Sequence, residues 1–161
     1  MSTDILIERA TPADVPLILT MITALAEYER MTDEVVATEA SLRASLFGER
    51  PAVDVVIARS GSEPVGFALW FYNYSTFLAR EGLYLEDLFV LPEWRGRGIG
   101  RALLAHLARV AVERGCGRME WSVLDWNESA IGFYRGLGAQ PMNAWTVFRL
   151  TGDALARMAK P

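Results

Sequence analysis

The stretch from Leu83 to Arg101 constrains the fold of this chain more than any other. Its first part, Tyr84 to Leu91, is rich in apolar and aromatic residues and has the length of a strand. Pro92 cannot donate to a sheet, so the strand should end there. Apolar residues recur at helical spacing from Ile99 onwards. Three glycines lie at every second position where this helical pattern begins: Gly96, Gly98 and Gly100. The sequence therefore predicts a strand, a glycine-rich turn and a helix N-terminus, in that order.

This order of elements suits the binding of a phosphate or pyrophosphate group. The first N–H groups of a helix have no partner within it and lie at the positive end of its dipole. Glycines let an anion approach these groups, and Arg95, Arg97 and Arg101 can add charge-assisted hydrogen bonds. The spacing matches neither the triphosphate loop, which ends Gly-Lys-Ser/Thr, nor the dinucleotide motif Gly-x-Gly-x-x-Gly. The alternative is a flexible loop with solvated arginines, which this order of elements disfavours.

Two segments resemble motifs of the GNAT N-acetyltransferase superfamily. Residues 95–100, Arg-Gly-Arg-Gly-Ile-Gly, resemble its acetyl-CoA-binding motif Arg/Gln-x-x-Gly-x-Gly/Ala. Residues 127–134 resemble the later family segment Asn-x-x-Ala-x-x-Phe-Tyr. The resemblance implies that the following residues contact acetyl-CoA: Leu88, Phe89, Val90, Arg95, Gly96, Arg97, Gly98, Ile99, Gly100, Arg101, Asn127, Glu128, Ser129, Ala130 and Tyr134.

The same resemblance implies that the hydroxyl of Tyr134 lies close to the thioester sulfur and acts as the general acid. The chemistry agrees, because aminolysis of a thioester expels a thiolate that a nearby phenol can protonate. The alternative makes Tyr134 an ordinary core aromatic beside Phe133. The presence of both motifs in the same chain favours the catalytic interpretation.

Glu86 and Asp87 form an acidic pair within the predicted central strand. Adjacent strand residues point to opposite faces, so the two carboxylates cannot act together unless a bulge intervenes. An amine must lose a proton before it attacks a thioester, and a carboxylate can remove that proton directly or through water. We therefore predict that Glu86 is the base or a substrate anchor. The alternative is a pair of structural charges.

Nearly the whole chain resembles the diamine acetyltransferase family, which includes the spermidine/spermine and thialysine N-acetyltransferases. The segments that carry this resemblance are residues 25–29, 72–76, 84–90 and 123–127. It implies that the acceptor is contacted by Tyr28, Glu29, Glu86, Glu120, Trp121 and Ser122. The chain departs from the polyamine-specific pattern at residues 120–122, where that pattern has less bulk and a different polarity. The resemblance to the diamine acetyltransferase family also implies that the protein forms a homodimer.

The remaining pattern predicts one α/β domain over residues 1–161, with a GNAT fold in which helices flank a mixed central β-sheet. Thr11 and Thr38 should cap two early helices, which end near Arg30 and Gly48. A later helix should be followed by Gly138. The expected remaining elements are strands 5–9, 53–58, 65–74, 119–124 and 145–150 and helices 129–137 and 152–160.

Composition excludes several classes of function. The net charge of −4 argues against a nucleic-acid partner and is compatible with a cationic substrate. No apolar run is long enough to span a membrane, and the N-terminus shows no signal peptide. A single cysteine, Cys116, excludes an internal disulfide and fits the cytoplasm. One histidine, His106, and the absence of Cys/His ligand spacing predict no metal.

These observations lead us to interpret the chain as a cytoplasmic, acetyl-CoA-dependent N-acetyltransferase. The acceptor would be the primary amine of a small cationic molecule, either a polyamine or diamine or a thialysine-like compound. The amine would attack directly in a ternary complex, and a backbone N–H near Phe89 would hold the oxyanion. An amino acid, an aminoglycoside or a protein amine stays open as the acceptor. A non-catalytic acyl-CoA sensor also stays open, although Glu86 and Tyr134 disfavour it.

Overall fold

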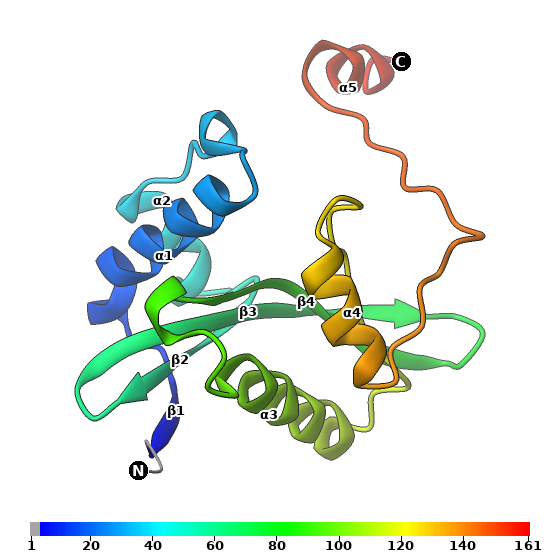
Figure 1. Ribbon diagram of the computed structural model, residues 1–161. Helices are drawn as coiled ribbons and strands as arrows, with labels where there is room; N and C mark the ends of the chain where they lie inside the picture. Colours follow the sequence, from blue (N-terminus) through cyan, green and yellow to red (C-terminus); the bar gives the residue numbers. More distant parts are fainter. Residues whose placement is uncertain (1–3) are drawn as a thin grey trace. The chain divides into compact units, whose positions relative to one another are not determined.

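The structure is a computed structural model that describes residues 4–161 (Figure 1). The chain forms two compact units, one that ends at Ser122 and one that comprises Val123–Pro161. The expectation of a single domain over residues 1–161 therefore stays a prediction.

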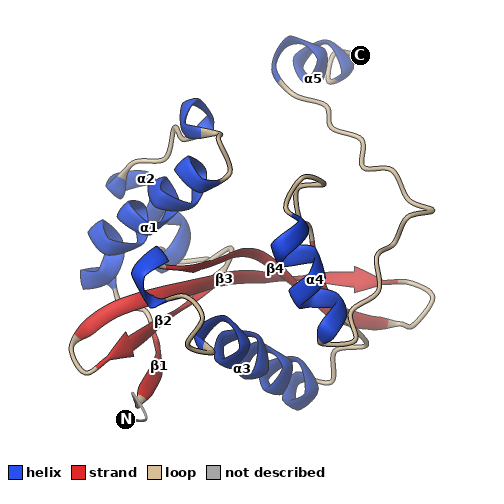
Figure 2. Ribbon diagram, in the orientation of Figure 1, coloured by secondary structure: helices blue, strands red, loops and turns tan. Residues whose placement is uncertain are grey.

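The first unit is built on a five-stranded mixed sheet (Figure 2). The strands lie in the order β1-β2-β3-β4-β5, with β1 to β4 antiparallel and β4 parallel to β5. Their bounds are β1 (Ile5–Arg9), β2 (Asp54–Ser60), β3 (Glu63–Ser75), β4 (Arg80–Val90) and β5 (Met119–Trp121). The mixed sheet and the β2–β3 hairpin confirm the predicted fold class.

Helices cover both faces of this sheet (Figure 1). On one side, α1 (Val15–Tyr28) and α2 (Glu39–Phe47) bury apolar residues such as Ile18 and Leu42 in a shared core with Phe67 and Leu69 of β3. The intervening residues of β3 point the other way, towards α3 (Ile99–Arg114). Burial of a side chain the size of Phe67 contributes about 2 kcal/mol.

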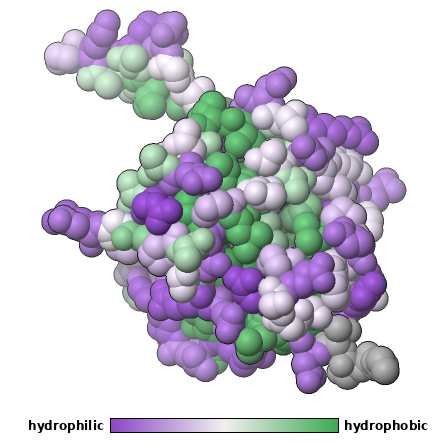
Figure 3. Space-filling view, turned by 90° about the vertical axis from the view of Figure 1, so that its left-hand side faces the viewer, coloured by the Kyte–Doolittle hydropathy of each residue, from purple (hydrophilic) through white to green (hydrophobic). Residues whose placement is uncertain are grey.

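The surface on the α1 and α2 side is partly apolar. Figure 3 shows hydrophobic residues near the centre of this side, with hydrophilic residues around them. Several apolar residues of α1, such as Leu19 and Leu25, are only partly buried against the core. This helix therefore packs with its fully buried stripe on the sheet and leaves other apolar side chains half-covered.

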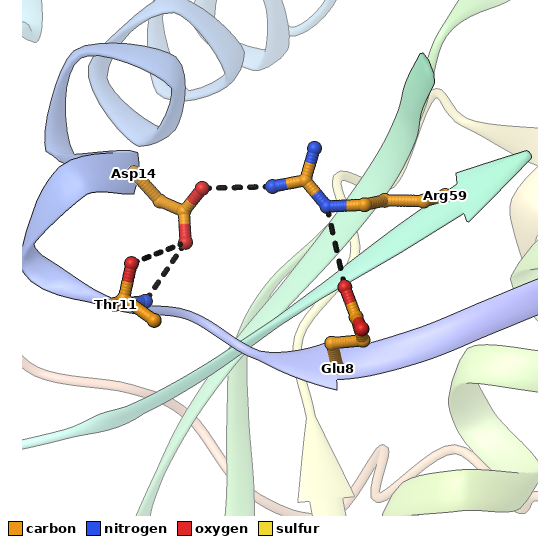
Figure 4. Close-up of polar contacts among 4 residues, drawn as sticks. All are labelled: Glu8, Thr11, Asp14 and Arg59. Carbon is orange, nitrogen blue, oxygen red and sulfur yellow. Dashed lines mark hydrogen bonds and ion pairs between the residues drawn. The ribbon is translucent and has the colours of Figure 1, made fainter. Parts of the chain in front are cut away.

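A polar cluster fixes the start of α1 against the sheet (Figure 4). Asp14 accepts hydrogen bonds from the N–H and the hydroxyl of Thr11, at 2.8 and 3.1 Å. Its other oxygen pairs with Arg59 of β2 at 2.8 Å, and Arg59 also lies 3.5 Å from Glu8 of β1. Thr11 is the N-cap residue of the 3₁₀ turn Pro12–Asp14 that leads into α1, so the helical segment begins where the sequence predicts, but the N-cap residue of α1 itself is Asp14. Thr38 caps α2 as predicted, accepting from the Ser41 N–H at 3.1 Å.

An irregularity interrupts the pairing of β3 with β4. Leu69 lies opposite Asp87, but the next residue, Trp70, lies opposite Leu85. Glu86 is therefore an extra residue in β4, which makes this a β-bulge. The bulge lies one residue beyond the last pair between β4 and β5, Leu85 with Trp121.

The second unit contains α4 (Glu128–Gly136) and α5 (Gly152–Met158). Gly138 follows α4 with a φ of 92°, as expected of a glycine that ends a helix. The predicted strand over residues 145–150 is wrong: the structure has no strand there, and Trp145 and Phe148 are 76% and 93% exposed. Apolar β-forming residues raised this expectation, but a strand also needs a hydrogen-bonded neighbour, which the described residues do not give it.

The strand predicted over residues 119–124 is shorter than expected. It ends at Trp121, because β4 stops pairing with β5 at Leu85, immediately before the bulge. Residues 122–127 then lead through a turn closed by a hydrogen bond from the Asn127 N–H to the Leu124 carbonyl at 2.9 Å.

Candidate active site

The glycine-rich turn has the geometry that the sequence predicts. Gly96 and Gly98 have φ values of 74° and 80°, in the left-handed region that favours glycine, and Gly98 is the N-cap of α3. A Cβ at either position would meet no protein atom within 4 Å, so the space beside the turn is open. The first N–H groups of α3, from Ile99 to Arg101, point towards the same end of the helix. An anion can therefore approach these groups.

Two arginines of this turn are held by aromatic rings. The Arg97 guanidinium lies 4.6 Å from the centroid of the Trp94 ring and donates to the Glu93 carbonyl at 3.3 Å. The Arg95 guanidinium lies 4.6 Å from the ring of Tyr28, and its Nε donates to the Val90 carbonyl at 2.9 Å. Their roles in binding acetyl-CoA stay predictions, as does that of the exposed Arg101.

Along one edge of β4, the backbone of the last residues is not paired with β5. The two strands pair only from Leu83 to Leu85, so nothing in β5 lies opposite Leu88 to Val90. The Leu91 N–H donates to the Val65 carbonyl of the chain segment that forms β3, at 2.9 Å. Because backbone groups of an antiparallel strand alternate in direction, those of Phe89 also face β3 and those of Leu88 and Val90 face the open edge. A ligand at the open edge can therefore reach the N–H groups of Leu88 and Val90, but not that of Phe89.

Three carboxylates interact near this edge. Burial, followed by the charges of Glu86 and Glu29, raises the pKa of Asp87 to about 6. Burial and the charge of Glu86 also raise the pKa of Glu29, which caps the C-terminal end of α1. Glu86 is exposed, whereas Asp87 and Glu29 are half-buried. The structure therefore brings together Glu29 and Glu86, two residues predicted to bind the acceptor, and can bind a cation or exchange a proton there.

Asp87 is a candidate site residue that the sequence analysis named but did not include in the predicted site. Strict alternation along a strand assigned it to the face opposite Glu86. The bulge removes this alternation at Glu86, and the two carboxylates interact. The adjacency of two acids in an apolar strand was the available signal, but the bulge depends on how β3 and β4 pair and has no signature in the local sequence.

The other residues predicted to bind the acceptor lie on or just after β5. Glu120 is opposite Tyr84 in the parallel pairing, and its carboxylate lies 2.9 Å from Arg118 Nε. Ser122 shares a 2.9 Å hydrogen bond with the Tyr84 hydroxyl. Trp121 is half-buried at the last paired position. The contact with Ser122 singles out Tyr84 as a further polar group near the end of the β4–β5 ladder.

Most of the predicted site residues of the second unit lie at the start of α4. The Asn127 side chain accepts from the Ala130 N–H at 3.3 Å and so caps this helix, while Glu128 and Ser129 lie exposed in its first turn. Tyr134 is half-buried, with its ring 5.6 Å from that of Phe133. Their contacts with acetyl-CoA, and the general-acid role of Tyr134, stay predictions.

A comparison with known protein families identifies the family of this chain. Residues 21–139 match the acetyltransferase (GNAT) family. The chain belongs to this family. As a GNAT protein it is an acetyl-transferring enzyme, and the resemblance noted in its motifs is confirmed.

Relatives of this GNAT enzyme share most of its length. The thialysine N-epsilon-acetyltransferase of Bos taurus is 39% identical over 96% of this chain and 97% of its own. The L-ornithine N5-acetyltransferase NATA1 of Arabidopsis thaliana is 37% identical over 96% of this chain and 87% of its own. Among solved structures, the integron cassette protein VCH_CASS6 of V. cholerae superposes with a TM-score of 0.82 at 28% identity, covering 100% of this chain and 99% of that one.

Two further observations bear on what the GNAT enzyme binds. Within residues 4–161, no helix combines the length and apolar character needed to cross a membrane. The same residues contain no group of three or more His, Cys, Asp or Glu side chains arranged to hold a metal ion.

Proposed function

We propose that this GNAT enzyme is an acetyl-CoA-dependent N-acetyltransferase whose acceptor is the primary amine of a small cationic molecule. The observation that carries the proposal is the interaction of Glu29, Glu86 and Asp87 beside the open edge of β4. Three neighbouring carboxylates repel one another, and a cationic acceptor relieves that repulsion. The relatives named for thialysine and L-ornithine support the same class, because both compounds carry a terminal primary amine.

The glycine-rich turn and β4 would bind acetyl-CoA. The N–H groups at the start of α3 and the arginines of residues 95–101 would hold the pyrophosphate. The outward-facing backbone groups of Leu88 and Val90 would pair with the amides of the pantetheine arm, as a neighbouring strand does. The family resemblance also implies acetyl-CoA contacts from residues 127–130 and Tyr134. Acetyl-CoA would supply the acyl group as an activated thioester.

The carboxylates would bind the acceptor and take its proton. In our proposal Glu29 attracts the ammonium group, and the Glu86–Asp87 pair accepts one proton from it, directly or through water. The neutral amine nitrogen forms a bond to the thioester carbon in a ternary complex. The N–H of Leu88 or Val90 stabilises the resulting oxyanion. The carbon–sulfur bond then breaks, Tyr134 gives its proton to the departing thiolate, and the second proton of the attacking nitrogen passes to Tyr134, so that a neutral amide and a free thiol are released.

Within this class, the acceptors differ in the charged groups that they carry besides the reacting amine. Thialysine and L-ornithine carry a carboxylate beside their second amine, whereas spermidine carries amines alone. Glu120 is already paired with Arg118, which reduces the negative charge available to a long polyamine at β5. We therefore expect the amino-acid diamines to be better acceptors than spermidine.

Thiol release from acetyl-CoA across a panel of amines tests the proposal. Thialysine, L-ornithine and spermidine represent the proposed class, and an aminoglycoside and an alanine-ended peptide represent the alternatives. Acceptor-dependent thiol release with the first group supports the proposal. Tight acetyl-CoA binding without release for any amine would instead indicate an acyl-CoA sensor. We also propose the homodimer that the resemblance implies and the cytoplasmic location that the single cysteine fits; sedimentation equilibrium tests the assembly.

A further inference from the structure

Arg95 connects three parts of the first unit through its side chain. Its guanidinium carbon lies 4.6 Å from the centroid of the Tyr28 ring and 5.3 Å from that of Phe89. Tyr28 is the last residue of α1, and Phe89 belongs to β4. The Arg95 Nε donates to the Val90 carbonyl at 2.9 Å, at the end of the same strand. A residue of the glycine-rich turn is thus held against α1 and β4.

We propose that Arg95 is a positioning residue for the acceptor. It holds the last turn of α1, and with it Glu29, against the part of β4 that carries Glu86 and Asp87. This inference rests on the proposed function, which places the acceptor amine among these carboxylates. It gives the Arg95 side chain a second role, in addition to the acetyl-CoA contact implied by the family motif.

The end of α1 needs such a contact because the protein core does not fix it alone. Tyr28 is 38% exposed, and the chain reverses at Arg30, which has a φ of 61°. The turn is closed by hydrogen bonds from the N–H groups of Glu29 and Met31 to α1 carbonyls, at 2.9 and 2.8 Å. Exposed helix ends open readily unless side chains hold them. An arginine over the Tyr28 ring, hydrogen-bonded to β4, supplies this restraint.

The direction of the effect separates positioning from simple electrostatics. Arg95 is a cation, and the proposed acceptor is also a cation. If Arg95 acted on the acceptor only through its charge, removing that charge would reduce repulsion and lower the acceptor KM. If Arg95 positions Glu29, the same change raises the acceptor KM.

The matched pair of variants is Arg95→Met and Arg97→Met. Both remove one positive charge from the same turn, but the Arg97 guanidinium stacks on Trp94 and donates to the Glu93 carbonyl, whereas that of Arg95 lies over the Tyr28 ring and donates to the Val90 carbonyl of β4. At saturating acetyl-CoA with thialysine as the acceptor, Arg95→Met should raise the acceptor KM about tenfold, the scale of one lost stacking contact and one charged hydrogen bond. Arg97→Met should weaken acetyl-CoA binding and leave the acceptor KM unchanged. An unchanged or lowered acceptor KM in Arg95→Met would overturn the proposal.

Two further measurements keep the test decisive. In a double-mutant cycle, Tyr28→Leu and Arg95→Met should be non-additive, because each change removes the same contact. Arg95→Lys, which keeps the charge but loses the planar stacking, should also raise the acceptor KM and provides a second variant if Arg95→Met does not fold.

Hydrogen exchange of the unliganded protein separates failure of this inference from failure of the proposed function. The N–H groups of Glu29, Arg30 and Met31 should exchange faster in Arg95→Met and Arg95→Lys than in wild type or Arg97→Met. If the wild type acetylates no amine, the proposed function fails, and this exchange still tests the restraint. Equal exchange in all four proteins would contradict the role of Arg95 at the end of α1.

Discussion

Glu86 and Asp87 are consecutive residues of β4: Glu86 is the extra residue of a β-bulge, and its charge adds to burial in raising the pKa of Asp87. Regular strand geometry would have sent the two side chains to opposite faces. The bulge also marks the place where β4 ceases to pair with β5, so an open backbone edge and a negative charge cluster occur together. Their coincidence is the structural basis of the proposed acetyl transfer to a cationic amine.

The raised pKa of Asp87 predicts how stability depends on pH. Its pKa rises from 3.8 to about 6 on folding, so the folded state keeps the proton over a pH range in which the unfolded state loses it. Stability should therefore fall as pH rises from about 4 to about 6, by up to about 2 kcal/mol for this group. Asp87→Asn removes the penalty and should raise Tm relative to wild type at pH 8 but not at pH 4.

Thermal unfolding at the two pH values checks this prediction. Glu63→Gln, which removes an exposed carboxylate from the start of β3, controls for the loss of one negative charge. A gain in Tm that is the same at pH 4 and pH 8 would mean that burial of the Asp87 charge is not its cause.

The same carboxyl group predicts the pH dependence of activity. Below about pH 6 the Asp87 carboxyl group carries a proton, so it binds a cationic acceptor less well and cannot accept the amine's proton. We expect kcat/KM for the acceptor to fall on the acid side with an apparent pKa near that value. In Asp87→Asn this acid limb should move or disappear, together with a loss of about a hundredfold in kcat/KM. An acid limb identical to that of wild type would assign it to another group.

The glycine-rich turn can be tested with two matched substitutions. Gly98→Ala and Gly61→Ala each place a Cβ on a backbone of positive φ, with no protein atom within 4 Å. Each should cost about 1 kcal/mol of stability, since both force alanine into the left-handed region. If an anion approaches the turn at Gly98, only Gly98→Ala should weaken acetyl-CoA binding in calorimetric titration. Equal affinity in the two variants would remove Gly98 from the cofactor site.

Tyr134→Phe tests the predicted general acid. The substitution removes one hydroxyl and keeps the ring that contacts Phe133. If the hydroxyl protonates the thiolate, kcat should fall about a hundredfold or more, while acetyl-CoA affinity changes little. An acyl donor with a more acidic leaving thiol should restore part of the rate. An unaltered kcat, when chemistry is rate-limiting, would show that Tyr134 serves as a packed aromatic.

Local rules were enough to predict most elements of the first unit. Thr11 and Thr38 begin helices, Pro92 follows the end of β4, and Gly98 precedes α3, because each of these residues acts through its own backbone or nearest neighbours. The bulge at Glu86 and the early end of β5 arise from pairing between strands distant in sequence, so local patterns could not indicate them. The incorrectly predicted strand over residues 145–150 has a related cause. β-forming residues alone do not make a strand unless another strand pairs with them.

The candidate site follows the same division. The Arg95–Gly100 motif predicted the turn and the helix N-terminus, which depend on a continuous segment. Asp87 and the stacking of Arg95 on Tyr28 depend on contacts between separate elements and became visible only in the folded chain. Family resemblance supplied Glu29, and the structure adds a physical reason for it, the interaction with Glu86.

The central claim is that carboxylates at the edge of β4 bind a small cationic amine for acetylation. Its most direct test is acceptor-dependent thiol release from acetyl-CoA with thialysine, measured for wild type and Glu29→Gln/Glu86→Gln, with mass spectrometry of the product. We predict a singly acetylated product and an acceptor KM at least about tenfold higher in the double variant, with the acetyl-CoA KM nearly unchanged. The absence of acetylated amine with the wild type, or an equal change in both KM values, would contradict the claim.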